Sequence, residues 1–209
     1  MNDTDIQRGA TRRSFRGKDL AWWCLSFVGF PIGGLVAEAI VGPIDEVWSA
    51  VIAGAIAGAA IGAAQWFALR QIGLDASTSG LFVRSNGALA WIGMTAAGLA
   101  LGLGVGVAIF DYGTSVGDLA VLGAVSGLGV GAAQWLVLRD HIRAGVLWIV
   151  GIAALWALGW TITTAGGIDV GQQWAVFGAY GCFTLACLQS TVISAFVPAP
   201  EASTLKVTS

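Results

Sequence analysis

The stretch GAVSGLGVGAAQW, residues 123–135, decides how this chain folds. Its glycines Gly123, Gly127 and Gly131 recur at every fourth residue, so an α-helix places all three on one face. That face carries no side chains, and the backbone of a neighbouring helix can therefore approach it closely. Close packing of this kind holds helices together inside a lipid bilayer, where burial of apolar surface between helices gives no advantage. The stretch therefore predicts a membrane-spanning helix that packs through its glycines.

Composition places the whole chain in a membrane. Of its 209 residues, 56% are hydrophobic and 11% are charged, whereas soluble globular domains have about 45–50% and about 25%. The mean hydropathy is +0.80. These values exclude a soluble enzyme, a disordered chain and a collagen-like chain, and the net charge of -2 gives no electrostatic basis for binding nucleic acid. The sequence therefore predicts an integral membrane protein whose first partner is the lipid bilayer.

Six apolar segments of about 20 to 24 residues follow one another, and each is long enough to cross the hydrocarbon core as a helix. They cover residues 20–40, 47–69, 87–110, 119–138, 145–166 and 174–196. We expect an all-α fold, with a six-helix transmembrane domain over residues 20–196. A cytoplasmic N-terminal tail, 1–19, precedes this domain, and a cytoplasmic C-terminal tail, 197–209, follows it.

The glycine pattern occurs three times along the chain. In the fourth segment the row of glycines leads into a glutamine, a tryptophan and a terminal arginine, and the second segment repeats this order almost unchanged. The sixth segment keeps small residues and the glutamine at the same spacing but lacks the tryptophan and the arginine. The matching residues are Gly54, Gly58, Gly62, Gln65, Trp66 and Arg70; Gly123, Gly127, Gly131, Gln134, Trp135 and Arg139; and Gly178, Cys182, Ala186 and Gln189.

The helices that precede these three segments also repeat. Trp22, Trp91 and Trp148 precede the three glutamines by 43, 43 and 41 residues. The repeating unit is therefore a hairpin of two helices. Its three copies cover about 20–70, 87–139 and 145–196. Every copy begins on the same side of the membrane, so the copies are parallel repeats, and a bundle with pseudo-threefold symmetry is the simplest architecture.

The basic residues indicate the orientation. With six spans, all ten lysines and arginines fall on the side of the N-terminus, and six of the twelve acidic residues fall on the opposite side, which has no basic residue. Basic loops stay in the cytoplasm, so both termini are predicted to be cytoplasmic. The alternative is a secretory signal that ends at Ala37-Glu38-Ala39. We favour an uncleaved helix because Pro31 and several glycines interrupt this segment and the repeat requires it.

The repeated glutamines Gln65, Gln134 and Gln189 are candidate functional residues. They could form a polar constriction around the pseudo-threefold axis, or they could clamp helices together through interhelical hydrogen bonds. Gln65 lies about 20° around the helix from Gly58 and so points toward the glycine contact. We favour the clamp because it explains why the glutamine belongs to the packing motif.

Two other features have both a functional and a structural interpretation. Glu38 is the one carboxylate well inside an apolar segment, and it is either a proton or cation site or a side chain that reaches interfacial water near the helix end. Trp148, Trp156 and Trp160 share one sector of the fifth helix, which either faces lipid or holds a lipid tail, a quinone, a carotenoid or a partner helix. We favour the interfacial carboxylate and the lipid-facing tryptophans.

Arg70, Arg139, Trp66 and Trp135 stand at the predicted cytoplasmic ends of the second and fourth helices. Tryptophan is typical of membrane interfaces. An arginine at a helix C-terminus complements the helix dipole and reaches phospholipid headgroups through its apolar stem. We expect the two arginines to bind anionic lipid weakly rather than to hold a specific substrate.

The sequence offers no residues for catalysis or for a cofactor. Its one histidine, His141, lies in a loop, and no lysine lies inside a predicted span. Histidine-ligated haem, chlorophyll or metal in the membrane therefore has no support, and a retinal Schiff base is excluded. Motifs of hydrolases, proteases and phosphoryl-transfer enzymes are absent. Cys24, Cys182 and Cys187 are interpreted as small buried residues rather than as a disulfide framework. We expect no enzyme activity, no cofactor and no metal.

The run from Gly123 to Arg139 resembles helices of small, uncharacterised polytopic bacterial membrane proteins, in which a glycine-rich stretch leads into Gln-Trp and a final Leu-Arg. The resemblance implies a bacterial inner membrane and brings no activity with it. Two functions stay open. A structural or accessory subunit that packs on other membrane proteins fits the scarcity of polar side chains in the spans, and a channel or transporter for a small uncharged solute along the axis is the alternative.

The charge distribution generates a prediction about topology. Reporter enzymes fused at Tyr112 and at the C-terminus should report an exported position and a cytoplasmic position, respectively, because every basic residue lies on the side of the termini. An exported C-terminus would contradict the six-span arrangement.

Overall fold

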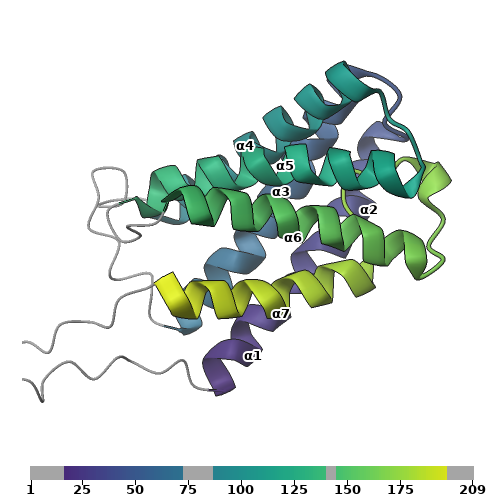
Figure 1. Ribbon diagram of the computed structural model, residues 1–209. Helices are drawn as coiled ribbons and strands as arrows, with labels where there is room; N and C mark the ends of the chain where they lie inside the picture. Colours follow the sequence, from purple (N-terminus) through teal and green to yellow (C-terminus); the bar gives the residue numbers. More distant parts are fainter. Residues whose placement is uncertain (1–16, 73–86, 140–144, 197–209) are drawn as a thin grey trace, which may run out of the picture.

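The computed structural model describes residues 17–72, 87–139 and 145–196, and all regular structure in these residues is helical (Figure 1). The helices, with η marking a short 3₁₀ helix, are α1 (Gly17–Leu25), η2 (Ser26–Val28), α2 (Gly29–Val41), α3 (Val47–Gln71), α4 (Gly87–Phe110), α5 (Val116–Leu138), α6 (Gly145–Ala165), η3 (Val170–Gln172) and α7 (Ala179–Phe196). Because α1, η2 and α2 follow directly on one another, we treat them as one rod, Gly17–Val41. The prediction of an all-α fold is confirmed.

Five rods are long and apolar enough to cross a membrane. They are Gly17–Val41, α3, α4, α5 and α6, with 21 to 25 residues each. The sixth helix of the described chain, α7, has 18 residues and begins at Ala179 rather than at residue 174, because a loop that contains η3 occupies the residues before it. The chain is therefore a multi-pass membrane protein, and a sixth span in α7 stays a prediction.

Polar loop residues determine where two of the rods begin. The side chain of Glu46 caps α3 by accepting a hydrogen bond from the backbone N–H of Ser49. In return, the Ser49 hydroxyl accepts from the backbone N–H of Glu46 at 3.1 Å. The Ser115 hydroxyl accepts from the Asp118 backbone N–H at 3.2 Å and caps α5. The first N–H groups of a helix have no partner within the helix, so these caps stabilise its start.

The rods follow one another around the bundle in the order of the chain. α3 packs against α2 and α4, α5 packs against α4 and α6, and α7 packs against α6. α7 also packs against α1 and η2, so the first and last helices close a ring (Figure 1). The third hairpin differs from the other two, because its loop covers residues 166–178 whereas theirs cover only 42–46 and 111–115. Pseudo-threefold symmetry therefore stays a prediction.

The two glycine rows lie at contacts between rods. A Cβ atom added to Gly58 of α3 would lie 2.7 Å from the Cα of Ala96 in α4, and one added to Gly127 of α5 would lie 2.7 Å from the Cα of Ala153 in α6. Non-bonded carbon atoms prefer a separation of about 3.5–4.0 Å, so neither position accepts a side chain unless the partner backbone moves. The other glycines of the two rows face the same partner rods; they are Gly54, Gly62, Gly123 and Gly131.

Small residues also pack the two helices of each hairpin together. A Cβ atom on Gly33 of α2 would lie 2.9 Å from the Cα of Ala57 in α3, and one on Gly102 of α4 would lie 2.8 Å from the Cα of Ser126 in α5. In the third hairpin Gly181 of α7 faces the backbone of α6. Close backbone approach therefore recurs at successive contacts around the ring.

The tryptophans of the fifth predicted helix contradict the expectation that they face lipid. Trp148, Trp156 and Trp160 of α6 are at most 3% exposed. Glycine in α5 leaves them space, because a Cβ atom on Gly123 would lie 2.6 Å from Cδ1 of Trp160. Trp156 and Trp160 also pack edge to face against Phe177, with ring centroids 5.2 and 6.0 Å apart. This sector therefore belongs to the protein core.

Leucine substitutions at the packed glycines test this architecture. We expect Gly58→Leu and Gly127→Leu to lower the Tm of the detergent-purified protein by roughly 5 °C or more, because each leucine would overlap the backbone of the next rod. Gly93→Leu on α4 and Gly151→Leu on α6 are the matched controls, since an added Cβ atom there meets no atom within 4 Å. Equal Tm values for Gly58→Leu and Gly93→Leu would contradict close packing.

Candidate functional site: a buried layer of glutamine and tryptophan

Gln65 of α3 and Gln134 of α5 are joined by a hydrogen bond inside the ring. The Nε2 group of Gln134 donates to Oε1 of Gln65 at 2.9 Å and lies 3.5 Å from the Thr95 hydroxyl of α4. All three side chains are at most 3% exposed. Because α4 packs against both α3 and α5, this polar cluster connects three consecutive rods. The bond therefore has the geometry of an interhelical clamp.

The clamp connects different helices from those that the glycine row brings together. The row on α3 faces α4, whereas the amide of Gln65 meets an amide of α5. Gln189 of α7 is 3% exposed, but within the described residues no hydrogen bond joins it to the other two glutamines. The structure therefore brings together two of the three repeated glutamines. The third, Gln189, is buried but does not join them.

The glutamines belong to a layer to which every rod contributes one buried side chain. The layer lies at the predicted cytoplasmic end, where α1 begins and α7 ends, three to seven residues from the helix ends. The rods that start at this end contribute tryptophans and the rods that finish there contribute glutamines, and all six side chains are at most 3% exposed. These residues, which we call the Trp–Gln layer, are Trp23, Gln65, Trp91, Gln134, Trp148 and Gln189.

The buried tryptophan of the first rod is not the one whose distance from Gln65 matches the repeat. Trp22, which lies 43 residues before Gln65, is half-buried and packs edge to face against Phe67, with centroids 5.8 Å apart. The buried residue is Trp23. The repeat spacing and the burial therefore select different members of the pair Trp22-Trp23.

Several polar atoms of the Trp–Gln layer have no hydrogen-bond partner in the described residues. They are the indole Nε1 groups of Trp23, Trp91 and Trp148 and the Oε1 atom of Gln134. An indole N–H can only donate and an amide oxygen can only accept. An unpaired buried group of this kind costs about 1–3 kcal/mol. The layer can therefore donate to and accept from a small neutral polar molecule, such as water.

The opposite end of the ring is covered by the loop of residues 166–178. The Tyr112 hydroxyl donates to the Trp174 carbonyl at 2.5 Å, and the backbone N–H of Ile44 donates to the Gln173 carbonyl at 3.3 Å. Gln173 adopts a left-handed conformation with φ of 52° at this junction. Burial raises the pKa of Tyr112, so the phenol keeps the proton that it donates. The third loop therefore ties the other two loops together across this end.

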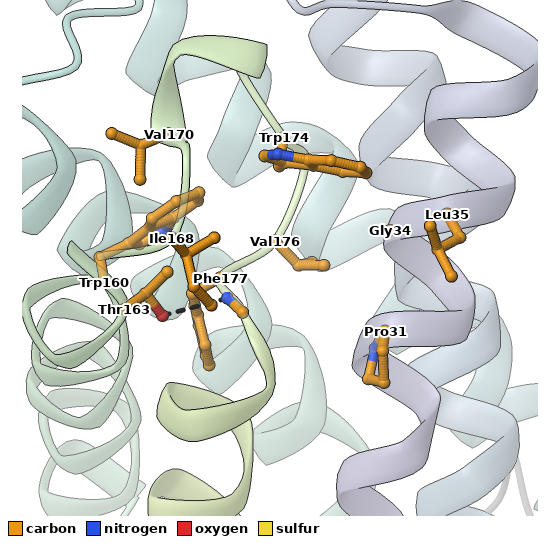
Figure 2. A pocket seen from close by; sticks show the side chains of 11 residues that line it. Pro31, Gly34, Leu35, Trp160, Thr163, Ile168, Val170, Trp174, Val176 and Phe177 are labelled. Atoms are coloured by element: carbon orange, nitrogen blue, oxygen red, sulfur yellow. Dashed lines mark hydrogen bonds between the residues drawn. The ribbon is translucent and has the colours of Figure 1, made fainter. Parts of the chain in front are cut away.

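A cavity of about 200 Å³ lies under this loop, between α2 and α6 (Figure 2). Pro31 and Leu35 line it from α2, and Trp174 extends across its top in the view of Figure 2. Apart from its indoles, the one polar side chain among the lining residues is Thr163. Its hydroxyl donates to the Gly159 carbonyl at 2.8 Å and accepts from a backbone N–H at 3.0 Å. The cavity is therefore apolar.

The other predicted site residues lie near the ends of the rods. Glu38 is half-buried, three residues before the end of α2, and belongs to no metal-binding cluster of the described residues. Arg70 and Arg139 are exposed, and Trp66 and Trp135 are half-buried, at the end that holds the Trp–Gln layer. The interfacial roles of these residues stay predictions, and His141 lies outside the described residues.

Comparison with protein-family models, with curated proteins and with solved structures finds no match to this chain. The function is therefore argued from the residues and their geometry. Three features bear on the function: the paired glutamines, the end that the loop of residues 166–178 covers, and the apolar cavity.

A double-mutant cycle tests the clamp. Gln65→Leu and Gln134→Leu should each destabilise the protein, and the double variant should be more stable than the sum of the two losses by about 0.5–1.5 kcal/mol, because each single change leaves a buried amide unpaired. The measurement is the free energy of unfolding in detergent. Gln65→Leu combined with Gln189→Leu is the matched control and should be additive. Additive losses for Gln65 and Gln134 would contradict the clamp.

Proposed function

We propose that this integral membrane protein is a non-catalytic structural or accessory subunit of a larger complex in a bacterial inner membrane. Its apolar rods place it in the bilayer. The proposal assigns the interior of the ring to packing and the outer surface to binding of other membrane proteins.

The observation that carries the proposal is a continuous hydrophobic core. One cluster of contacting buried side chains extends from Trp23 and Trp148 in the Trp–Gln layer to Ile44 and Tyr112 in the loops at the opposite end. A path for a polar solute needs polar groups along its length to replace lost hydration. Between the two ends of this cluster the buried side chains are mostly alanine, leucine, isoleucine and aromatic residues. The core therefore supports a scaffold rather than a pore.

The outer surface of α4 supports binding to a partner helix. Gly93 and Ala97 are both exposed and lie one helical turn apart, and a Cβ atom on Gly93 would meet nothing within 4 Å. Leu89 and Leu101 continue the same face and are 67% and 65% exposed. Two small residues four apart allow another helix to approach its backbone in lipid. The partner that this face fits is therefore a single apolar transmembrane helix.

The alternative function is a channel for a small uncharged solute, and the unpaired polar atoms of the Trp–Gln layer favour it. Three indole donors and one amide acceptor at a single level of the ring could receive a neutral molecule. The covered outer end argues against a continuous path, because Ile44 and Phe177 are each 1% exposed there. We therefore keep transport as the second candidate.

Purification in mild detergent tests the accessory function. We expect a stoichiometric membrane-protein partner to accompany the wild type and the Gly151→Leu variant, and to be lost from Gly93→Leu, because only the latter places a side chain on the proposed contact of α4. Circular dichroism and Tm should show that the wild type and both variants are folded. Retention of the same partner by Gly93→Leu would contradict the proposed face.

Proteoliposomes test the alternative. The accessory function predicts that uptake of glycerol or urea is no faster than in protein-free vesicles. Faster uptake that Gln65→Leu changes would favour the channel and overturn the proposal.

A further inference from the structure

The seam between the first rod and α7 brings two cysteines into direct contact. The Sγ atoms of Cys24 in α1 and Cys187 in α7 lie 2.9 Å apart, although 163 residues separate them in the chain. Both thiols are free and half-buried. A disulfide bond is ~2.05 Å long, so the two sulfur atoms need to approach by less than about 1 Å to bond.

Other contacts along the seam hold these cysteines in register. The first rod and α7 run in opposite directions, so residue numbers that rise along one should fall along the other. Phe27 of η2 packs edge to face on Phe183 of α7, with ring centroids 5.6 Å apart and an interplanar angle of 89°. This contact lies one turn beyond the cysteines on both helices. Farther along, Gly34 of α2 faces Val176 in the loop before α7, where a Cβ atom added to the glycine would lie 2.9 Å from Cγ2 of the valine. The sulfur contact therefore belongs to an ordered antiparallel interface.

We infer that Cys24 and Cys187 form a reversible disulfide that locks the ring at the seam between its first and last helices. This inference is independent of the proposed function, because it concerns closure of the ring and not the outer face of α4. The seam joins the first and last helices of the described chain, whereas the other ring contacts join rods that are neighbours in the chain. Oxidation would therefore hold this closing contact of the ring covalently.

The chemistry is thiol–disulfide exchange with a small-molecule disulfide as oxidant. The thiolate of one cysteine attacks a sulfur atom of the oxidant, forms a mixed disulfide and releases one small thiol. The second cysteine gives up its proton and attacks the protein sulfur of the mixed disulfide, which forms the Cys24–Cys187 bond and releases the second small thiol. The protein loses two hydrogens and is oxidised, and the oxidant gains them and is reduced to two thiols.

Cys182 provides the matched control on the same helix. It is fully buried, and its thiol donates to the Phe177 carbonyl at 2.9 Å, whereas the contact between thiols joins Cys24 to Cys187. Serine at this position can keep the same hydrogen bond. Cys182→Ser therefore removes one thiol and leaves the proposed lock unchanged.

The test treats the full-length protein in lipid nanodiscs with 4,4′-dithiodipyridine, an uncharged aromatic disulfide, followed by proteolysis and mass spectrometry without reduction. We expect a peptide that links Cys24 to Cys187 in the wild type and in Cys182→Ser, and a thiopyridine adduct on Cys187 in Cys24→Ser. Stable adducts on both cysteines of the wild type, or a link through Cys182, would overturn the inference.

A thermal measurement on the same samples tests the lock. A crosslink that closes so long a loop restricts the unfolded chain strongly. The oxidised wild type should therefore melt roughly 5–10 °C above the dithiothreitol-treated protein, and this difference should vanish in Cys24→Ser and persist in Cys182→Ser. Equal Tm values for oxidised and reduced wild type would show that the bond, even if formed, does not lock the seam.

Discussion

Close approach of helix backbones at glycine is the constraint on which the rest of this structure depends. In a bilayer, lipid tails are as apolar as the side chains that leave them, so helices associate through dispersion contacts and hydrogen bonds between their own atoms. Gly58 against Ala96 and Gly127 against Ala153 bring two backbones within a distance at which a side chain has no room. Many such contacts, each weak alone, add up along a helix. The order of the ring follows from which rods carry them.

The same constraint determines what fills the interior. Rods that approach closely leave little width for a pore, and the large side chains of the core occupy the space that the glycines release. Trp160 lies against Gly123 for this reason. Polar side chains are then confined to places where they can pair, as Gln134 does with Gln65. Such a pair contributes about 1 kcal/mol in a membrane. It therefore adds specificity to a bundle that the glycine contacts already hold together.

Patterns along the chain predicted the fold better than the site. Glycines at every fourth residue and apolar stretches of membrane length predicted the helices, because both are local properties of one segment. The prediction that the tryptophans of α6 face lipid was wrong. An all-apolar helix has no polar side that marks its outer face, and the burial of these tryptophans depends on the space that Gly123 leaves on another rod. The contact between Cys24 and Cys187 had no local signal either, because it depends on how the ring closes. The position of the loop of residues 166–178 likewise depends on hydrogen bonds to the other loops. The length of the loop in the sequence does not predict these bonds.

The central claim is that glycine contacts build a ring whose interior is filled by side chains and has no continuous water path along its axis. Amide hydrogen exchange of the full-length protein in lipid nanodiscs tests it most directly, because backbone N–H groups exchange only where water reaches them. The account predicts slow exchange throughout 54–65 of α3 and 123–134 of α5, comparable to the most protected helices of the protein. Fast exchange along these two stretches, at the level of the exposed loops, would show water along the axis and would contradict the account.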